Sequence, residues 1–313
     1  MDHIIKTLKC LGIYYKETKK EHVFQEISDK PFVYEIPVKS FSASVNATFS
    51  ALFKKGTSKI IDPTEEAEFY DILDFLKKAG AEIKFQGNQL IVKGKAKLKG
   101  TEYKTMNDRQ DFATWVSAAL TTNSQIEITD IDYKKMRLEQ MENVLNNMNI
   151  SLYYSKDSCL VPSQLISIKP TEIFAGKYPD FQTEWQILFS PLLTQIKGKS
   201  RVVEKIFPNR MQHWKELEKM GVKYKYIESK IIPEYPHTAK GKRPPNAVEV
   251  TGPVKLKGAK VEAQDVRCGA ALIIAGLAAK GKTEILNIEH IERGYENIVK
   301  RLQELGVNIE ISE

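Results

Sequence analysis

The chain repeats one local pattern five times: an amphipathic helix, a single turn residue and a short strand-like run. Each turn residue is glycine or asparagine, which tolerate the left-handed backbone that ends many helices. Successive turn residues are 68, 69, 72 and 85 residues apart, so one structural repeat recurs along the chain. The five turn residues are Gly12, Gly80, Asn149, Gly221 and Gly306.

A second and more apolar series of helices lies between the members of the first series. Each of these helices precedes a further strand-like run, and this alternation predicts an α/β fold. We expect the apolar helices to be buried and the amphipathic helices to lie outside. The apolar helices are predicted at residues 43–56, 111–122, 184–198 and 265–281.

The two series differ in number, because five amphipathic helices accompany only four apolar ones. The first amphipathic helix begins at Met1, so we expect the chain to begin inside a repeat. Six repeats in two groups of three would form two similar domains, and the first of these would then be incomplete. The longest step between turn residues contains residues 231–246, whose prolines and basic residues predict a surface loop between strands.

Composition places the chain among globular proteins of two domains, with 313 residues, 42% hydrophobic and 28% charged. Residues 1–20 alternate charged and apolar side chains and lack the apolar core of a signal peptide. We expect a cytoplasmic protein with no membrane insertion. The net charge of +7 is spread along the chain, which argues against nucleic-acid binding and leaves a lysine-rich surface or attraction of a small anionic substrate.

Cysteine and histidine form no pattern typical of a zinc site or a disulfide framework. We therefore expect no metal site. Cys10 and Cys268 fall inside predicted helices, where we expect both to be packing residues, and Cys159 stands apart from them.

Three segments carry a specific resemblance: residues 178–221, which include IFPNRMQH, residues 265–276, and residues 290–310, which include ERGYE. They resemble the C-terminal domain of the UDP-N-acetylglucosamine enolpyruvyl transferases, which catalyse the first committed step of peptidoglycan synthesis. RNA 3′-phosphate cyclases are built from similar repeats, and the shikimate-pathway enolpyruvyl transferases share the fold. The IFPNRMQH and ERGYE segments favour the first family.

The resemblance implies the inside-out α/β barrel of that family, with two pseudo-threefold domains of three repeats each. Residues 1–105 would form an incomplete first domain and residues 106–313 a complete second one, with the active site in a cleft between them. In the implied reaction, the sugar 3-hydroxyl adds to C2 of phosphoenolpyruvate and phosphate is then eliminated. Phosphoenolpyruvate and UDP-N-acetylglucosamine are the substrates, and no cofactor or metal is required.

Such a reaction needs guanidinium groups for phosphate and carboxylate, and a carboxylate near the attacking hydroxyl. Arg210, Arg267 and Arg293 each follow a predicted strand and precede a helix, where the family places its cleft arginines. By this resemblance Arg210 and Arg267 bind substrate and Arg293 is catalytic. The alternative is that each arginine is exposed or paired at the surface.

Glu184 is the second implied catalytic residue, at the position of a family aspartate proposed as the base for the sugar hydroxyl. The extra methylene is a departure, since misplacement by about 1 Å can cost about a hundredfold in rate. The alternative is an ordinary acidic residue at a helix N-terminus. Asp265, at the start of the last apolar helix, either orients Arg267 or caps its helix.

The remaining implied substrate contacts lie mostly before the first apolar helix. Lys39, Ser40, Phe41 and Ser42 resemble the stretch that binds the uridine diphosphate, although a helix cap by Ser40 or Ser42 explains them nearly as well. Asp2 and His3 match the end of the uracil-binding loop, and Ile206 a substrate-contacting position. Glu66 and Glu68 match acidic positions that line the same cleft, although an acidic first helical turn explains them almost as well. Asp108 and Arg109 resemble the segment where the chain crosses between the domains, and we expect them to form a structural ion pair.

The family's N-terminal lysine and asparagine and its mobile acid-bearing loop have no counterpart in this sequence. Three hypotheses follow. The chain is part of a transferase that acts with a complementary N-terminal fragment, a non-catalytic protein that binds the nucleotide sugar or a cell-wall partner, or a shikimate-type transferase.

Overall fold

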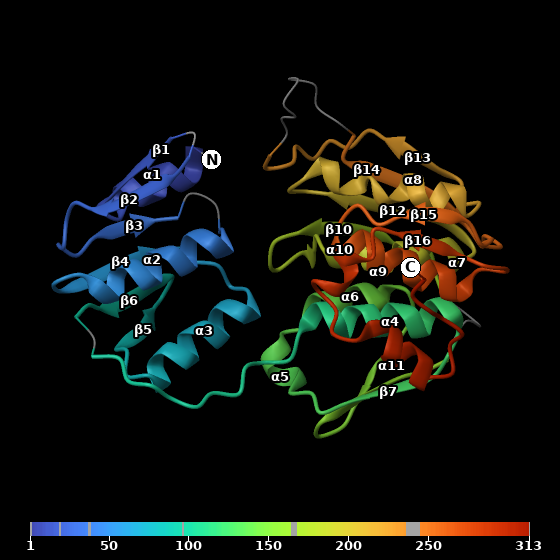
Figure 1. The fold of residues 1–313 in the computed structure, drawn as a ribbon, viewed down its shortest axis with the longest axis horizontal. Coiled ribbons are helices and arrows are strands. Elements are labelled where there is room, and N and C mark those ends of the chain that lie inside the picture. Colours follow the sequence, from blue (N-terminus) through green and yellow to red (C-terminus); the bar gives the residue numbers. More distant parts are fainter. Residues whose placement is uncertain are drawn as a thin grey trace. The chain divides into compact units, whose positions relative to one another are not determined.

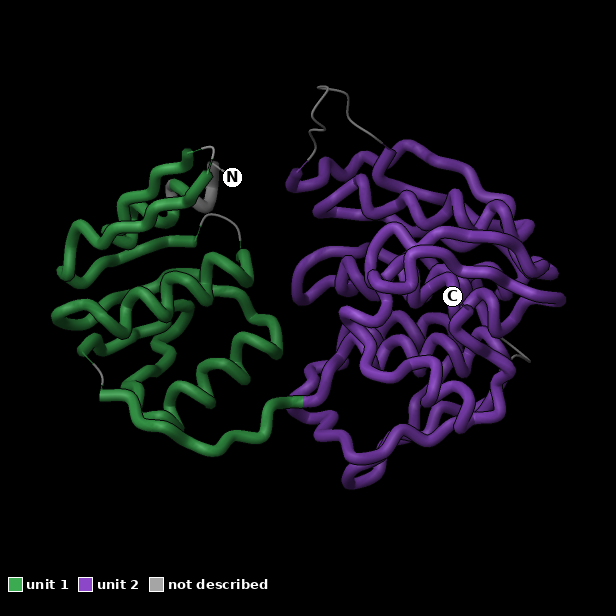
Figure 2. Tube along the Cα trace, viewed as in Figure 1, with its two compact units in different colours: residues 1–106 green, residues 107–313 purple. Residues whose placement is uncertain are grey.

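The computed structural model describes residues 2–18, 20–36, 39–95, 97–163, 168–235 and 245–312. The chain forms two compact units, residues 1–106 and residues 107–313 (Figure 2). The first unit contains, in chain order, α1 (Asp2–Cys10), β1 (Ile13–Glu17), β2 (His22–Glu26), β3 (Val33–Glu35), α2 (Phe41–Phe53), β4 (Thr57–Ile61), α3 (Ala67–Lys78), β5 (Ile83–Gln86) and β6 (Gln89–Lys93).

The second unit is larger and repeats the same alternation of helices and strands (Figure 1). Its elements are α4 (Arg109–Thr122), β7 (Ile126–Thr129), α5 (Tyr133–Met136), α6 (Glu139–Asn147), β8 (Tyr153–Tyr154), β9 (Ser158–Val161), β10 (Glu172–Gly176), β11 (Phe181–Gln182), α7 (Trp185–Gln195), β12 (Gly198–Glu204), the 3₁₀ helix η1 (Pro208–Met211), α8 (His213–Lys219), β13 (Tyr224–Ile227), β14 (Ala247–Gly252), β15 (Lys260–Glu262), α9 (Val266–Ala278), β16 (Glu284–Leu286), α10 (Glu289–Glu292) and α11 (Ile298–Glu304).

Left-handed turn residues end all five amphipathic helices, α1, α3, α6, α8 and α11, as the sequence predicts. Positive φ lets the chain reverse directly after the last helical turn, so the following residues can join a sheet. The φ angles are 73° at Gly12, 104° at Gly80, 63° at Asn149, 98° at Gly221 and 85° at Gly306.

Strand pairing confirms that the repeat is structural. In the first unit the sheet order is β3-β4-β6-β5, and in the second the order β10-β12-β14-β13 recurs with β11 added at the edge. In both sheets a parallel pair is joined through an apolar helix, and the last two strands form an antiparallel pair after an amphipathic helix. Residues 231–246, the predicted loop, fall between β13 and β14 in the sequence, and residues 236–244 of that loop lie outside the described residues.

Three apolar helices, α4, α7 and α9, contact one another and form the core of the second unit (Figure 1). Leu188 and Phe189 of α7 and Leu272 and Ile274 of α9 are fully buried. Ser117 Oγ of α4 donates to the Leu188 carbonyl of α7 at 2.7 Å, so a buried hydroxyl also joins two of these helices. Helices that are apolar all round belong in such a core.

The apolar helix of the first unit, α2, is buried on one face only. Ala47 and Ala51 are fully buried, whereas Phe49 and Phe53 are 41% and 64% exposed. The expectation of a buried helix therefore holds for α4, α7 and α9 but is wrong for this face of α2. Among the described residues of the first unit there is no second apolar helix to cover it.

The prediction of a strand at residues 307–311, after the last amphipathic helix, is also wrong. The described residues there are in no strand, and Ile311 is 55% exposed. In four other repeats the strand after the amphipathic helix pairs with a neighbour, but β15 and β16 pair only with each other in the described chain. A run with strand propensity needs such a partner to satisfy its backbone groups.

Among the described residues, no helix combines the length and the apolar character that crossing a bilayer requires.

Gly94 lets the end of β6 approach the end of α2 closely. A Cβ atom there would lie 2.0 Å from the Lys54 carbonyl oxygen and 2.8 Å from that of Ala51. We predict that Gly94→Ala lowers the free energy of unfolding of the first unit by about 1–3 kcal/mol, because backbone must move to admit the methyl group. Gly100→Ala is the control, since nothing lies within 4 Å of its Cβ. Equal urea midpoints for the two variants would contradict this account.

Candidate active site

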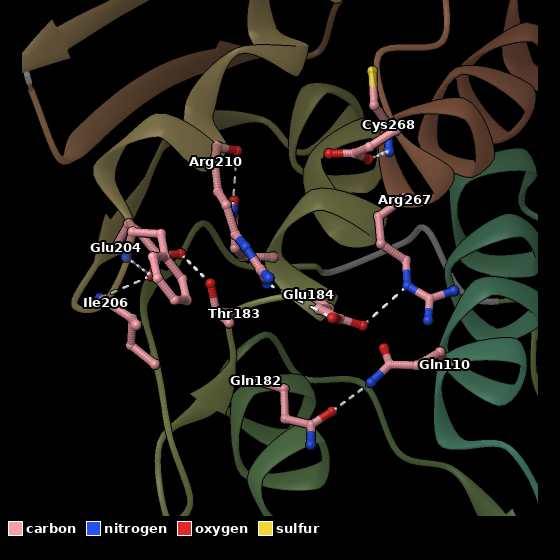
Figure 3. A network of polar contacts seen from close by, with 12 residues as sticks. Gln110, Gln182, Thr183, Glu184, Glu204, Ile206, Arg210, Arg267 and Cys268 are labelled. Atoms are coloured by element: carbon pink, nitrogen blue, oxygen red, sulfur yellow. Dashed lines mark hydrogen bonds and ion pairs between the residues drawn. The ribbon is translucent and has the colours of Figure 1, made fainter. Parts of the chain in front are cut away.

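Glu184 lies between β11 and α7, at the N-cap position of α7, but its side chain makes no capping hydrogen bond. The carboxylate instead extends toward two arginines from other elements (Figure 3). Its Oε2 accepts from Arg267 Nε at 3.0 Å, and its Oε1 lies 3.8 Å from Arg210 Nη1. Glu184 therefore lies at a helix N-terminus, as the alternative has it, but its side chain pairs with arginines and does not cap the helix.

The two arginines come from different repeats. Arg210 lies in η1, directly after β12, and Arg267 is the second residue of α9, so both are at strand-to-helix junctions as expected. Their side chains are 32% and 20% exposed. In each guanidinium the Nη1 atom is buried and has no hydrogen-bond partner among the described residues. These two N–H groups need an acceptor, and a bound anion would supply one.

The N-termini of the three core helices meet at this cluster. Gln110, the second residue of α4, donates from Nε2 to Gln182 Oε1 at 2.8 Å, two residues before Glu184. Glu184 in turn binds Arg267 near the start of α9 (Figure 3). Each helix N-terminus carries a partial positive charge, so the arrangement adds to the attraction for an anion.

Tyr295 also lies beside the Arg267 guanidinium group. The Arg267 guanidinium carbon lies 5.4 Å from the centre of the Tyr295 ring, and the Tyr295 hydroxyl is 2.8 Å from Thr114 Oγ1. Tyr295 is only 2% exposed, and this burial raises the pKa of its hydroxyl above the ordinary value, although Arg267 opposes the effect. The tyrosine therefore stays protonated and can keep its hydrogen bond with Thr114.

Glu204 fixes the two segments that carry Glu184 and Arg210. This carboxylate is fully buried at the end of β12. It accepts from Thr183 Oγ1 at 2.5 Å, and from the backbone N–H groups of Ile206 at 2.9 Å and Phe207 at 3.1 Å (Figure 3). Burial raises the pKa of the Glu204 carboxyl, while these donors and Arg210 oppose the shift. One side chain thus holds the residue before Glu184 and the turn before Arg210.

We predict that Glu204→Ala costs about 2–4 kcal/mol of unfolding free energy, because it leaves buried donors without an acceptor. Glu204→Gln keeps one carbonyl oxygen for the two backbone N–H groups and should cost less than about 1 kcal/mol. Urea unfolding of both variants compares these costs. If alanine and glutamine prove equally damaging, the hydrogen bonds to Glu204 are not what stabilises these segments.

His213 contacts the backbone carbonyl oxygen of Arg210. The imidazole is 2% exposed, with Nε2 at 2.7 Å from Ser190 Oγ and Nδ1 at 3.1 Å from the Arg210 carbonyl oxygen. Burial lowers the pKa of His213 to about 4, although the Arg210 carbonyl opposes this. The ring is therefore neutral at pH 7 and donates one N–H, which suits the carbonyl acceptor at Nδ1.

This depressed pKa predicts a loss of stability in acid. Between pH 6.5 and about 4 the unfolded chain takes up a proton at His213 and the folded chain does not, so the free energy of unfolding falls as the pH falls. From pH 7 to pH 5 the loss from this group is about 2 kcal/mol. Between pH 7 and pH 5, the free energy of unfolding of His213→Gln should therefore fall by about 2 kcal/mol less than that of the wild type. The control His290→Gln, at a partly exposed position, should show the same fall as the wild type. Parallel pH profiles for all three proteins would refute the assignment.

The other residues of the second unit singled out by the sequence are less directly involved. Arg293 follows α10 and precedes α11, so the expectation that it lies between a strand and a helix is wrong, and its side chain is exposed. Asp265 caps α9 by accepting from the Cys268 N–H at 2.8 Å, which is the capping alternative. Ile206 is 5% exposed, and its backbone N–H binds Glu204.

The predicted diphosphate-binding stretch lies at the N-terminus of α2. Ser40 is the N-cap and accepts from the Ala43 N–H at 3.4 Å, and Lys39 pairs with Glu65, which raises the pKa of the lysine. Phe41 and Ser42 are exposed in the first turn. The cap explanation thus accounts for Ser40 without excluding a ligand at the exposed turn.

Several further expectations concern residues of both units. Asp2 and His3 begin α1, and their side chains lie outside the described residues. Glu68 lies in the first turn of α3, after Glu66 at its N-cap position, as the helical explanation predicts. Asp108 caps α4 by accepting from the N–H groups of its first turn, and the neighbouring Arg109 is fully buried, 5.5 Å from the Trp185 ring centre.

Cys10 and Cys268 were both expected to be packing residues, and the structure bears this out for one of them. Cys268 is buried as predicted, but Cys10 is exposed at the end of α1, so its assignment as a packing residue is wrong. The reason is helical phase, since the last turn of α1 turns Cys10 away from the core side occupied by Leu11. Among the described residues no group of histidine, cysteine or acidic side chains could hold a metal ion.

Glu204, Thr183 and Tyr295 were not recognised from the sequence. Glu204 ends an apolar strand three residues before Phe207 of the FPNR segment, and a charged residue at that point was the available signal. Tyr295 belongs to the ERGYE segment, but nothing local indicates that its hydroxyl meets Thr114 in another repeat.

A protein-family model described as EPSP synthase (3-phosphoshikimate 1-carboxyvinyltransferase) matches residues 1–302. Curated relatives include UDP-N-acetylglucosamine 1-carboxyvinyltransferase 2 from Geobacillus kaustophilus, 34% identical over 88% of this chain and 60% of that protein. The protein of the same name from Streptococcus mutans is also 34% identical, over 88% of this chain and 61% of its own length. The chain therefore spans about three fifths of these relatives, and the resemblance inferred from its motifs is confirmed.

Solved structures show the same fold. The enolpyruvyl transferase NikO from Streptomyces tendae superposes with a TM-score of 0.85 at 19% identity, over 99% of this chain and 72% of that one. EPSP synthase from Acinetobacter baumannii gives a TM-score of 0.70 at 18% identity, over 100% of this chain and 72% of its own. The predicted inside-out α/β fold is confirmed by these likenesses.

Proposed function

The chain belongs to the EPSP synthase family of enolpyruvyl transferases, and from this premise we propose that it takes part in transferring the enolpyruvyl group of phosphoenolpyruvate to the 3-hydroxyl of UDP-N-acetylglucosamine. The observation that carries this proposal is the cluster of Glu184 with Arg210 and Arg267, whose buried Nη1 atoms need an anionic partner. The reaction supplies such a partner in its phosphorylated substrate.

In this proposal Arg210 and Arg267 bind the phosphate or carboxylate of phosphoenolpyruvate through charge-assisted hydrogen bonds. Glu184 accepts the proton of the sugar 3-hydroxyl as the hydroxyl oxygen bonds to C2, while C3 gains a proton from an acid carried by the complementary N-terminal fragment. The intermediate then loses the C3 proton and its C2–O bond to phosphate, which gives the enol ether and free phosphate. Arg293, which is exposed, contacts the substrate anion from the end of α10.

The nucleotide end of the acceptor is assigned to the first unit. The exposed first turn of α2, with Lys39, Ser40, Phe41 and Ser42, offers backbone N–H groups and a cation for the diphosphate. Asp2 and His3 are proposed for the uracil, and Ile206 and Asp265 for positions beside the sugar. These roles rest on resemblance, supported by the position of the helix N-terminus.

The chain spans only 60–61% of its first curated relatives, so the complete reaction is proposed for this chain together with a complementary N-terminal fragment. Residues 1–105 would then be the later repeats of one domain, and residues 106–313 the whole of the other. The product would enter peptidoglycan synthesis, and the three free cysteines suit a reducing cytoplasm.

UDP-N-acetylglucosamine is preferred as acceptor over shikimate 3-phosphate because the relatives at 34% identity carry the former in their names. The test is release of phosphate from phosphoenolpyruvate by the purified chain, with and without the part of the Geobacillus kaustophilus relative that lies outside the match. Turnover with UDP-N-acetylglucosamine that depends on this fragment supports the proposal. Turnover with shikimate 3-phosphate alone would reassign the acceptor, and tight nucleotide-sugar binding without turnover would indicate a non-catalytic protein.

Arg267→Gln should lower kcat/KM in this assay about 10- to 100-fold, because it removes a charge-assisted contact worth about 1.5–3 kcal/mol. The matched control is Arg201→Gln on β12, whose side chain is 51% exposed and pairs with Glu249. That variant should keep wild-type kinetics. An equal loss in both variants would mean that charge, rather than the position of Arg267, governs the rate.

A further inference from the structure

The carboxylate of Glu184 lies between Arg210 and Arg267, the two arginines of the proposed anion site. Glu184 uses both of its oxygens, with Oε2 at 3.0 Å from Arg267 Nε and Oε1 at 3.8 Å from Arg210 Nη1. The cluster therefore already contains an internal anion. An incoming anion must compete with Glu184 for the same guanidinium groups, and this competition has consequences for which ligands the site accepts.

The backbone under Glu184 is held firmly, so its carboxylate cannot drift away at no cost. Thr183, the preceding residue, is bound to the fully buried Glu204 at 2.5 Å, and Trp185, the following residue, is fully buried at the start of α7. A tethered group near its partner acts at an effective concentration in the millimolar range or above. A free carboxylate brings only the single negative charge that Glu184 already supplies.

A phosphate group differs because it brings two negative charges and three acceptor oxygens. It can engage the buried Nη1 atoms of Arg210 and Arg267 that Glu184 leaves without a hydrogen bond. We propose that Glu184 is a specificity-determining residue, which excludes singly charged carboxylates from the two arginines and yields only to a phosphorylated ligand. The inference rests on the proposed function, since it takes this cluster as the anion site.

Displacement of Glu184 also serves the chemistry. Once a phosphate takes over the two arginines, the carboxylate is released from its ion pairs and becomes available to accept the proton of the acceptor hydroxyl. The base is thus freed only when the phosphorylated substrate is in place. Side-chain length matters here, because an aspartate would end about 1.5 Å sooner and would lose the 3.0 Å contact with Arg267.

Titration calorimetry on the full chain with two probes, inorganic phosphate and acetate, tests this proposal. Glu184→Gln removes the competing charge and Glu184→Asp keeps the charge but shortens its reach. Both should bind phosphate about tenfold more tightly than the wild type, and acetate should bind measurably only to the variants. The matched control is Asp180→Asn, which removes a carboxylate four residues away that pairs with Lys205 and should leave both affinities unchanged.

The outcomes separate this inference from the proposed function. If wild type and Glu184→Gln bind phosphate equally, and Arg267→Gln abolishes that binding, the anion site stands and the competition by Glu184 is refuted. If none of the proteins binds phosphate, including Glu184→Gln, both the site and the competition are refuted. Tighter binding in Glu184→Gln but not in Glu184→Asp would reduce the effect to net charge and overturn the role of side-chain length.

Discussion

Packing of the three apolar helices against one another is the constraint on which the second unit depends. Because α4, α7 and α9 bury most of their side chains against one another, each can lie only where its neighbours leave room. Their N-termini then meet, and each delivers one part of the candidate site: Gln110 from α4, Glu184 from α7 and Arg267 from α9. Repetition of one structural unit thus assembles a polar cluster from three distant parts of the chain.

Buried polar residues then determine how accurately this cluster is held. Glu204 and His213 each satisfy their hydrogen-bonding groups with backbone or hydroxyl partners beside Glu184 or Arg210. Groups that are buried and fully bonded resist movement, since any displacement leaves a donor or acceptor without a partner. In the described part of the chain, the buried Nη1 atoms of Arg210 and Arg267 make no hydrogen bond, and the same is true of Gln110 Oε1 in the same cluster.

Local order was readable from the sequence because its causes are local. Helical periodicity and the left-handed residues Gly12, Gly80, Asn149, Gly221 and Gly306 located the amphipathic helices correctly. Residues 307–311 and the outer face of α2 were not predictable in the same way, since strand pairing and burial depend on what another segment provides. For the same reason the contact of Tyr295 with Thr114, 181 residues away, left no trace in either local segment.

The candidate site shows the same division. Motifs supplied Glu184, Arg210 and Arg267, but not the fact that the glutamate binds both arginines. The most direct test of the account is a crystal structure of the chain with phosphoenolpyruvate. We predict that the ligand's phosphate lies within hydrogen-bonding distance of both guanidinium groups and that the Glu184 carboxylate has left Arg267. Phosphoenolpyruvate bound elsewhere, with Glu184 still paired to Arg267, would contradict it.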